Sequence, residues 1–486
     1  MNITITLGSV NSYITIDGNA LEEKTVLDLC DKACSFMRHN YFFSTAYRKG
    51  QYDGKKHLFN TKQRSFPTGL FFRLAKAFEK ANLTECICLE NADVLKVTLP
   101  IHPVSQKPDR EYRQYQEESL QAALTFPRGV FRLATNAGKT AIMCDIVEAY
   151  GLPKTIVVVP NKTLLYQTSD TFKASFGKDK IGLIGEGKFQ SDAQLIVATA
   201  QTLGSKKRKK EVIKLLEQVE LLLIDETHHV GINSWYKIAM LCTAKYRFGF
   251  SGTAFDRTDG ADMMLEAACG VLLKEVSNKD LIDLGVSCPV VVHMHTEDSM
   301  SIKKGDVEDY EQLVTEGIVM NPYRNKKIIT LIKDSLANNK QVLVAVHYVK
   351  HGQILYELLK ESGLGDACVF VQGEVEGEDR SIILQAFKEG LLKVIVATVV
   401  FAEGVDVPNV DVLIQASSGK SKIAALQWIG RGIRNYENKV LHLHDFWDKT
   451  HKDILMKHSR KRFKHYQNEH FDFADEGKLD FGGKTE

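Results

Sequence analysis

The segment Ala134–Thr140, with the sequence ATNAGKT, has the residue types of a phosphate-binding loop. Small residues let backbone N–H groups close around phosphates, the Lys139 ammonium can reach the β- and γ-phosphates, and the Thr140 hydroxyl can hold Mg²⁺. The spacing departs from the simplest pattern, because Leu133 stands where that pattern has its first glycine. A strand predicted before the loop and a helix predicted at Ala141–Tyr150 support the same chemistry, because phosphates bind at helix N-termini.

Two adjacent carboxylates follow the apolar segment Leu221–Ile224, which predicts a buried strand. Asp225 stands at the end of this strand, where a carboxylate can hold Mg²⁺, usually through water. Glu226 can orient and deprotonate an attacking water molecule. The alternative is a pair of surface acids that cap a strand, and a phosphate loop in the same sheet argues against it.

A second group of charges lies far beyond the loop, in Gln427–Arg434 with the sequence QWIGRGIR. Its guanidinium groups, on Arg431 and Arg434, are planar and permanently charged, so they can neutralise a γ-phosphate as it leaves. If both segments face one nucleotide, ATP hydrolysis can close and open a cleft between two domains. The residues therefore predict an ATP-driven motor.

The composition limits the class of protein. A chain of 486 residues is long enough for two or three domains, and 44% apolar with 26% charged residues is typical of soluble proteins. The apolar runs are far shorter than a membrane span, and the N-terminus lacks the features of a signal peptide. Nine cysteines with irregular spacing fit a reducing compartment. We therefore expect a cytoplasmic protein without a membrane partner.

A zinc site is one alternative that the cysteines leave open. Cys30-x3-Cys34 and Cys86-x-Cys88 could together supply four thiolates to a tetrahedral zinc ion. The other interpretation, which we favour, is that these are small buried residues on a helix face and on a strand.

Basic residues are concentrated in three segments, although the formal net charge is only +2. Arg48–Lys80 and Lys449–Lys464 are both strongly basic, and Lys206–Lys210 is an unbroken basic run that predicts an exposed loop. Such segments suit a phosphate backbone, whose contacts give affinity without sequence information. They are equally compatible with solvated faces, so charge alone does not decide for nucleic acid.

The elements that must position these residues fall into three blocks. Residues 1–100 predict a small α+β domain, with two strands at the start, a helix at Thr25–Met37, a turn at Asp53-Gly54 and a helix at Leu70–Ala81. After residue 110, buried strands alternate with helices, which indicates a parallel sheet covered on both faces. The first group of strands is expected at Gly129–Ala134, Thr155–Pro160, Leu195–Ala198, Leu221–Asp225 and Phe248–Ser251.

The same alternation repeats in the second half of the chain. Its strands are expected at Gln341–Val346, Cys368–Gln372, Lys393–Thr398, Val410–Gln415 and Val440–Asp445. We therefore predict an α/β fold with two tandem parallel-sheet motor domains behind a small α+β N-terminal domain. The predicted bounds are 1–100 for the N-terminal domain, 110–275 for the first, ATP-binding, motor domain, 276–325 for the linker and start of the second, 326–450 for the second, and 451–486 for a basic C-terminal helix and tail.

These motifs, taken in order, resemble those of superfamily 2 DExH-type helicases, whose motor domains are RecA-like. Asn136 stands in place of the usual glycine of motif I, but Lys139 and Thr140 are retained. The matching segments are Arg113-x-Tyr115-Gln116 (Q motif), Thr135–Thr140 (motif I), Val157–Gln167 (Ia), Ala198–Leu203 (a strand-contact segment), Asp225–His228 (II), Ser251–Thr253 (III), Val342–His347 (IV), Ala397–Pro408 (V) and Gln427–Arg434 (VI).

The resemblance implies a role for each matching residue, with ATP and Mg²⁺ as cofactors. Asp225, Glu226, Lys139, Gln427, Arg431 and Arg434 would be catalytic, Arg434 being the arginine finger. Arg113, Tyr115, Gln116, Thr135, Asn136, Ala137, Gly138, Lys139, Thr140, Gly404 and Asp406 would bind the nucleotide. Thr140 and Asp225 would ligate Mg²⁺, and His228, Ser251 and Thr253 would couple the nucleotide to the strand. Thr163, Thr199 and Thr398 would contact strand phosphates.

A finer resemblance lies in the N-terminal block. Tyr47-Arg48-x-Gly50-x-Tyr52-Asp53-Gly54, followed by Phe66-Pro67-x-Gly69-Leu70, is similar to the N-terminal domain of phage recombination helicases of the UvsW type. It implies duplex contacts through Arg48, Lys49, Lys55 and Lys56. The alternative is a hairpin whose glycines only serve turns.

The predicted function is an ATP-dependent DNA helicase that acts on branched duplex DNA by branch migration or by fork or R-loop remodelling. The resemblance implies recombination, repair or replication as the process, and the host cell cytoplasm if the chain is phage-encoded. DNA would be the partner of a monomer. The alternative is an ATP-driven translocase or nucleic-acid sensor that does not separate strands.

Overall fold

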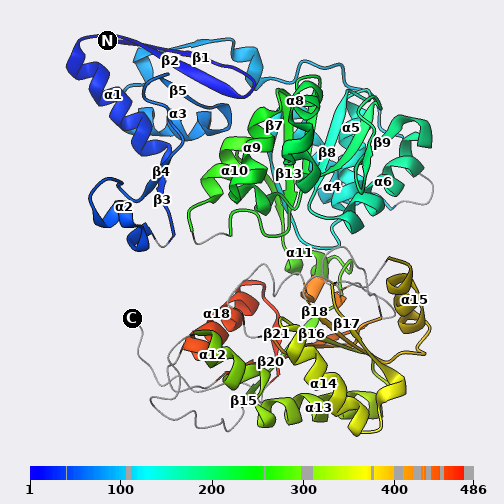
Figure 1. Cartoon of the computed structure of the whole chain (residues 1–486). Helices are drawn as coiled ribbons and strands as arrows, with labels where there is room; N and C mark the ends of the chain where they lie inside the picture. Colours follow the sequence, from blue (N-terminus) through cyan, green and yellow to red (C-terminus); the bar gives the residue numbers. More distant parts are fainter. Residues whose placement is uncertain are drawn as a thin grey trace. The chain divides into compact units, whose positions relative to one another are not determined.

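The computed structural model describes residues 1–39, 41–105, 111–256, 259–296, 310–373, 377–398, 409–417, 419, 428–430, 432–433, 439–448 and 454–474, the side chains of 377, 378, 380 and 381 excepted. The chain divides into two compact units (Figure 1). The first comprises Met1–Leu133 and Ala137–Val276, and the second comprises Ala134–Asn136 and Ser277–Glu486. In the described part of the chain, no helix is both long and apolar enough to cross a membrane.

The N-terminal module has a four-stranded sheet in the order β5-β2-β1-β6. Side chains that alternate along β1 and β2, such as Ile3, Ile5 and Ile14, are buried, as the period of a half-covered strand requires. The elements are β1 (Asn2–Thr6), β2 (Asn11–Asp17), α1 (Ala20–Ala33), β3 (Ser35–Met37), η1 (Tyr41–Phe43), α2 (Thr45–Arg48), β4 (Lys55–His57), β5 (Ser65–Pro67), η2 (Thr68–Leu70), α3 (Phe71–Lys80), η3 (Thr84–Cys86), β6 (Ile87–Glu90) and η4 (Ala92–Leu95).

Helix α1 differs from the predicted helix at Thr25–Met37. It starts earlier because Asn19 caps it: the side chain of Asn19 accepts the N–H groups of Leu21 and Glu22, and Glu22 bonds back to the Asn19 N–H. Residues after Cys34 leave the helix and form β3, which pairs with β4 in a separate two-stranded ribbon. Leu70–Ala81 agrees with α3 to within a residue at each end.

The first unit also contains an eight-stranded sheet in the order β10-β9-β11-β8-β12-β13-β7-β14, with helices on both faces (Figure 1). Only the β9–β10 pair is antiparallel. Its strands are β7 (Arg128–Leu133), β8 (Thr155–Val159), β9 (Ile181–Gly185), β10 (Lys188–Phe189), β11 (Leu195–Thr199), β12 (Leu221–Asp225), β13 (Tyr246–Ser251) and β14 (Leu272–Val276). Its helices are α4 (Gln114–Thr125), α5 (Lys139–Ala149), α6 (Lys162–Phe176), α7 (Ala200–Leu203), α8 (Lys209–Leu216), α9 (Asn233–Leu241) and α10 (Asp262–Cys269).

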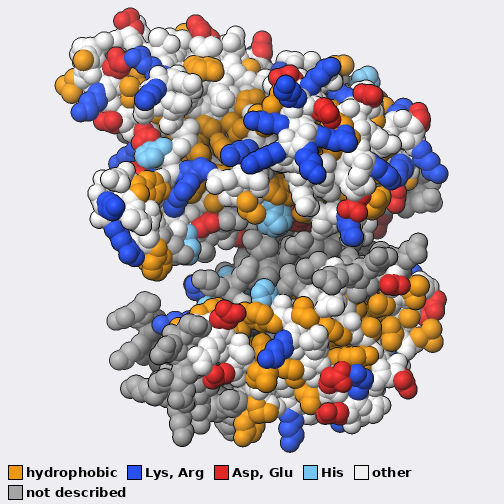
Figure 2. All heavy atoms as spheres, in the orientation of Figure 1, with side chains coloured by type: hydrophobic (Ala, Val, Ile, Leu, Met, Phe, Trp, Pro, Cys, Tyr) orange, Lys and Arg blue, Asp and Glu red, His pale blue; other side chains and the backbone are white. Residues whose placement is uncertain are grey.

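The run Lys206–Lys210 differs from the predicted loop. Lys206–Arg208 form a 3₁₀ turn that leads directly into α8, although all five side chains are exposed. Figure 2 shows Lys and Arg side chains gathered on the face of the first unit over α8 and α9.

The second unit is built on a seven-stranded parallel sheet in the order β17-β18-β16-β19-β20-β15-β21. Residues 276–325, predicted as the linker and start of this domain, contain α11, β15, α12 and a π-helix. The elements are α11 (Asn278–Asp283), β15 (Val290–Thr296), α12 (Tyr310–Val314), the π-helix η8 (Thr315–Val319), α13 (Pro322–Ala337), β16 (Val342–Val346), α14 (Val349–Glu361), η9 (Gly365–Ala367), β17 (Cys368–Val371), α15 (Gly377–Lys388), β18 (Val394–Thr398), β19 (Val412–Gln415), β20 (Leu441–Trp447), α18 (Ile454–Asn468) and β21 (Asp472–Phe473).

A buried ionic network fastens α18 to this sheet. Arg462 makes two hydrogen bonds of 2.8 Å to the two oxygens of Asp445 and donates to Asp448 at 3.1 Å. Arg324 on α13 donates to the other oxygen of Asp448 at 3.1 Å, and the Tyr466 hydroxyl donates to Asp445 at 2.8 Å. All five side chains are buried. The basic helix predicted in the C-terminal segment therefore packs one face into the second unit, while its other basic side chains, such as Lys461, stay exposed.

Four histidines line one face of the strand pair β15–β20. His293 Nε2 lies 3.0 Å from His442 Nδ1, and His295 Nε2 lies 2.8 Å from His444 Nδ1. Burial lowers the pKa of His295 to about 4, with Lys327 and His293 adding to the effect, and burial together with the neighbouring histidines lowers the pKa of His444 to about 2. These two rings are therefore neutral at pH 7.

The cysteines that raised the zinc alternative lie in and near the core of the N-terminal module. Cys30 and Cys34 are buried, and burial raises the pKa of the Cys30 thiol to about 12. Cys86 is half-buried, and Cys88 is exposed on β6. Among the residues that the structure describes, no group of three or more His, Cys, Asp or Glu side chains is arranged to hold a metal ion.

Candidate nucleotide-binding site

The phosphate loop connects β7 to α5. Asn136 has φ of 76° and Gly138 has φ of 81°, so left-handed residues stand on both sides of Ala137 before the helix starts at Lys139. Asparagine is one of the few residues that adopt this conformation readily, which explains how it replaces glycine in the motif. Turns of this kind direct successive N–H groups to one side, where they can bind an anion at the helix N-terminus.

Gln116 lies against this loop. It is buried on α4, and its Nε2 donates to the Ala137 carbonyl at 3.0 Å. A Cβ atom at Gly138 would lie 2.6 Å from the same nitrogen, so a larger residue there would strain the left-handed backbone and would also displace the Gln116 amide. The contact of Gln116 with adenine stays a prediction, and the hydrogen bond to Ala137 shows that the side chain also fixes the loop. Arg113 immediately precedes α4 and donates to the buried Tyr115 hydroxyl at 3.3 Å.

The paired carboxylates lie at the end of β12, between β8 and β13 in the sheet. Asp225 is buried, and its Oδ1 accepts the Glu226 N–H at 2.9 Å. Burial and the negative charge of Glu226 raise the pKa of Asp225 to about 6, against the opposing effect of Lys139. Lys139 Nζ lies 3.9 Å from Glu226 Oε1. Residues predicted from two separate motifs, Lys139 from one and Asp225 with Glu226 from the other, are therefore brought together.

The residues predicted to couple the site to the strand surround Glu226. His228 Nδ1 lies 3.3 Å from Glu226 Oε2 and 2.9 Å from the Ser251 hydroxyl, which is itself 3.4 Å from Glu226 Oε2. Thr253 donates its N–H to the Ser251 hydroxyl at 3.1 Å. His228, Ser251 and Thr253 are buried. Any displacement of the Glu226 carboxylate must therefore change hydrogen bonds to the turn after β12 or to the end of β13.

The oxygen donors near the loop have the chemistry that Mg²⁺ requires. Thr140 follows Lys139 in the first turn of α5, and Asp225 is a buried carboxylate whose pKa is raised by burial and by the negative charge of Glu226. Hydroxyl and carboxylate oxygens are the ligands that a small hard cation prefers. A cation at this position would offset the desolvation of Asp225, so the residues fit the ion.

The threonines predicted to contact a nucleic-acid strand lie at or just after the ends of three β-strands. Thr163 is in the first turn of α6, directly after β8. Thr199 ends β11 and caps α7, where its hydroxyl donates to Thr202 Oγ1 at 2.9 Å. Thr398 ends β18 in the second unit and is buried. Their contacts with nucleic acid stay predictions.

Two of the four basic residues predicted to bind a duplex make contacts within the first unit. Arg48 Nε donates to the Phe42 carbonyl at 3.2 Å. Lys56 Nζ donates to Asn233 Oδ1 on α9 at 2.6 Å and lies 5.4 Å from the centre of the Tyr236 ring. Burial lowers the pKa of Lys56, with Arg38 and Lys237 nearby. Lys49 is exposed and Lys55 is half-buried.

Five predicted site residues lie outside the described residues: Gln427, Arg431, Arg434, Gly404 and Asp406. Their roles stay predictions. Trp428 and Ile433, which flank the arginines in sequence, are buried in the core of the second unit.

The glycines of the N-terminal motif have two different roles. Gly50 and Gly54 have φ of 66° and 83°, as the turn interpretation requires. Gly69 instead allows close packing: a Cβ atom there would lie 2.1 Å from the Glu266 carbonyl oxygen on α10. Sequence reasoning missed this contact, because the spacing Pro-x-Gly does not distinguish a turn from a packing contact.

Comparison with known proteins covers both units. The family described as "Type III restriction enzyme, res subunit" matches residues 109–256, and the family "Helicase conserved C-terminal domain" matches residues 324–436. ATP-dependent DNA helicase uvsW of Enterobacteria phage T4 is 27% identical over 95% of this chain and 97% of its own length. DNA 3'-5' translocase XPB2 of Sulfurisphaera tokodaii is 26% identical over 68% of this chain and 80% of its own.

The fold also matches solved structures. A fragment of an HsdR subunit of a type I restriction enzyme from Vibrio vulnificus superposes with a TM-score of 0.55 at 20% identity, over 81% of this chain and 71% of that one. This likeness concerns the fold alone. The two family matches, the alignment along nearly the whole chain and the DETH segment at the end of β12 agree with one another. The chain therefore belongs to superfamily 2 of the ATP-dependent helicases.

Proposed function

We propose that this helicase uses ATP and Mg²⁺ to remodel branched duplex DNA in recombination, repair or replication. The observation that carries the proposal is the extent of the similarity to the T4 DNA helicase, which spans 95% of this chain and so takes in the N-terminal module as well as both sheets. The proposal concerns DNA because that relative and the XPB2 translocase are both named for acting on it.

The nucleotide half of the proposal assigns each group near the loop a task. The N–H groups around Ala137 and the Lys139 ammonium bind the triphosphate, and Thr140 with Asp225 holds the metal ion, which supplies charge neutralisation at the phosphates. Glu226 accepts a proton from the attacking water. His228 and Ser251 hold the Glu226 carboxylate, so its position reports the nucleotide state to the end of β13.

The DNA half of the proposal rests on an arm of the N-terminal module, formed by η1, α2 and the β3–β4 ribbon. Phe42 is 49% exposed and Phe43 is 64% exposed on this arm, beside the exposed Arg48 and Lys49. Aromatic faces next to basic side chains suit nucleic acid, because bases stack on the rings while the cations meet phosphates. Unstacked bases occur at branch points, which supports a branched substrate over a fully paired one.

The test is the steady-state ATPase rate of the full chain with no nucleic acid, single-stranded DNA, linear duplex, a four-way junction, a fork, an R-loop and duplex RNA. We expect the greatest stimulation with the branched DNA molecules. Equal stimulation by linear duplex would contradict the preference for branches, and stimulation by RNA alone would contradict the choice of DNA.

The alternative is a double-strand translocase that does not separate strands. It is favoured by the similarity to XPB2, which is named a translocase and aligns with 68% of this chain. A labelled fork distinguishes the two functions. Release of a single strand in the presence of ATP indicates unwinding, whereas displacement of a bound protein block without strand release indicates translocation alone.

A further inference from the structure

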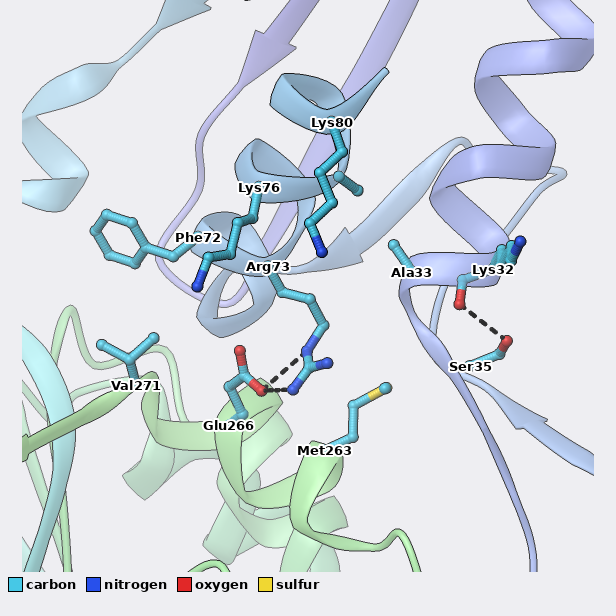
Figure 3. A pocket seen from close by; sticks show the side chains of 11 residues that line it. Lys32, Ala33, Ser35, Phe72, Arg73, Lys76, Lys80, Met263, Glu266 and Val271 are labelled. Atoms are coloured by element: carbon cyan, nitrogen blue, oxygen red, sulfur yellow. Dashed lines mark hydrogen bonds and ion pairs between the residues drawn. The ribbon is translucent and has the colours of Figure 1, made fainter. Parts of the chain in front are cut away.

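A groove of about 470 Å³ opens between the N-terminal module and α10, away from the nucleotide site. Figure 3 shows α3 on one side of it, the end of α1 with β3 on another, and α10 as its floor. The side chains of three lysines, Lys32, Lys76 and Lys80, border the groove. Phe72, which is 44% exposed, and Met263 supply apolar surface.

The charge of the groove is strongly positive. Its floor holds one carboxylate, Glu266, which is buried and paired with Arg73 by bonds of 3.0 Å from Nε and 2.5 Å from Nη2. This pair is neutral as a unit and fixes α3 to α10. The three lysines around it have no acid among the other groove-lining residues. Glu79 is the nearest acid in sequence on α3, and it does not line the groove.

The lysines are positioned by the period of α3. Phe72, Lys76 and Lys80 are four residues apart, so they share one exposed stripe, while Leu74 and Phe78 are buried on the opposite side. Figure 3 shows the Lys76 and Lys80 ammonium groups on the same side as the Arg73–Glu266 pair, directed towards α10. Like charges held on one stripe repel one another, and an anion between them removes that repulsion.

The groove is separate from the predicted strand contacts. Thr163 and Thr199 follow β8 and β11, in the half of the sheet beyond β12, whereas Val271 of the groove adjoins β14 at the opposite edge. A nucleic acid bound at both places must therefore reach from the β8–β11 half of the sheet to its β14 edge.

We propose that the groove is a second nucleic-acid site that binds the phosphodiester backbone of a duplex arm, with Lys76 and Lys80 contacting successive phosphates. The inference rests on the proposed DNA-remodelling function. Helix α10 lies between the groove and the nucleotide-binding site. It packs against η2 of the N-terminal module and against η7 (Thr227–Gly231), which directly follows Glu226. A shift of α10 on binding of a duplex arm would therefore move the turn that contains His228.

The test compares Lys76→Ala/Lys80→Ala with Lys24→Ala/Lys62→Ala, a control that removes the same charge from exposed lysines of the same module that do not line the groove. Binding of fluorescein-labelled duplex, four-way junction and single-stranded DNA is measured by anisotropy from 50 to 200 mM salt. We expect the groove variant to bind duplex and junction about tenfold more weakly than the control variant, with a salt slope smaller by about 1.8 for two lost phosphate contacts.

Three results would overturn the proposal. The first is the same affinity and slope in both variants. The second is an equal loss of affinity for single-stranded DNA and for duplex, which would exclude a duplex arm as the specific ligand of the groove. The third is displacement of labelled duplex by polyglutamate as effectively as by unlabelled duplex, which would assign the groove to an acidic protein. Circular dichroism melting of both variants checks that each is folded.

The outcome is independent of the branch preference. If wild-type ATPase shows no preference for branched DNA while the groove variant alone loses duplex affinity, the proposed function fails and the groove stands. If branched DNA stimulates most but the two variants bind alike, only the groove proposal fails.

Discussion

The conformation of the loop between β7 and α5 depends on which residues stand at positions 136 and 138. Asn136 and Gly138 both have positive φ, yet they are not equivalent, because a Cβ atom added at Gly138 would also lie too close to the amide nitrogen of Gln116. The sequence predicted the loop from its small residues, and it predicted Gln116 from a different motif. That the two residues meet follows only from the packing of α4 beside α5.

Gly138→Ala is expected to weaken ATP binding about tenfold. The reason is that a left-handed conformation costs a residue with a Cβ about 1–2 kcal/mol, and the methyl group also displaces Gln116. In a double-mutant cycle, the loss should be smaller in a Gln116→Ser background, since only the backbone strain remains. Titration with a fluorescent ATP analogue measures each affinity, and strictly additive effects would contradict the contact.

Glu226→Gln is expected to retain ATP and DNA binding while reducing turnover by at least about 100-fold, the lower range for loss of a general base. The amide keeps the shape of the side chain but cannot accept a proton from water. Phosphate release and nucleotide affinity are measured on the same preparation. Normal turnover would remove Glu226 from the mechanism.

At the scale of elements, the apolar runs predicted the central strands, and the ten expected strands all have counterparts in the structure. The misses have physical reasons. Strand β9 contains two glycines, β14 carries Lys274 and Glu275, and β15 carries His293 and His295 after its three valines, so none is a continuous apolar run. The start of α1 was marked by Asn19 and Glu22 in a capping box, a signal that the predicted start at Thr25 overlooked.

Helix α18 carries both buried and exposed basic side chains, and the charge pattern alone does not separate them. Its segment is basic enough to predict a surface for nucleic acid, but Arg462 is completely buried against Asp445 and Asp448. A guanidinium can be buried in this way when carboxylates satisfy it on both edges. No property of the sequence distinguishes Arg462 from the exposed Lys461 beside it except its place in the helical period.

Arg462→Ala is expected to destabilise the second unit by about 3–5 kcal/mol, because it leaves Asp445 and Asp448 buried with too little positive charge. Lys461→Ala, one residue away and exposed, should change stability by less than about 0.5 kcal/mol. Urea denaturation followed by circular dichroism measures both. Equal effects would show that the network contributes no stability.

The histidine pairs of β15 and β20 predict acid sensitivity. The pKa of His295 falls from 6.5 to about 4 on folding. Between pH 6.5 and 4 the unfolded chain therefore binds a proton at this histidine, whereas the native ring stays neutral. Stability is therefore complete above pH 6.5 and decreases as the pH falls towards 4. His295→Gln should show a shallower decrease of melting temperature over this interval, and an unchanged pH profile would contradict the assignment.

At the scale of the whole molecule, the N-terminal module is part of the first unit and not a separate attachment. Gly69 packs on α10, Arg73 pairs with Glu266, and Lys56 binds Asn233 on α9. The sequence predicted a distinct domain over residues 1–100, because the pattern of strands and helices changes near residue 110. That pattern carries no information about which surface such a domain packs against. The contacts make the module a fixed extension of the ATP-binding sheet.

Reversing Arg48, Lys49 and Lys55 to Glu is expected to weaken duplex binding at physiological salt without lowering the melting temperature, since these side chains are exposed or half-buried. Lys56→Glu should instead lower the melting temperature, because it places a carboxylate beside Asn233 and Tyr236. Anisotropy and thermal melting are measured on both variants. Unchanged duplex affinity in the triple variant would show that the arm formed by η1, α2 and the β3–β4 ribbon does not bind duplex DNA.

The position of β15 has a consequence for synthesis of the chain on the ribosome. This strand lies between β20 and β21, and 149 residues separate His295 from its partner His444. Both edges of β15 therefore stay unpaired while most of the second unit is being translated, and open strand edges invite pairing with other chains. Nascent chains halted before Leu441 should associate with chaperones, whereas those extended past Phe473 can close the sheet, so this unit is completed only by its last elements.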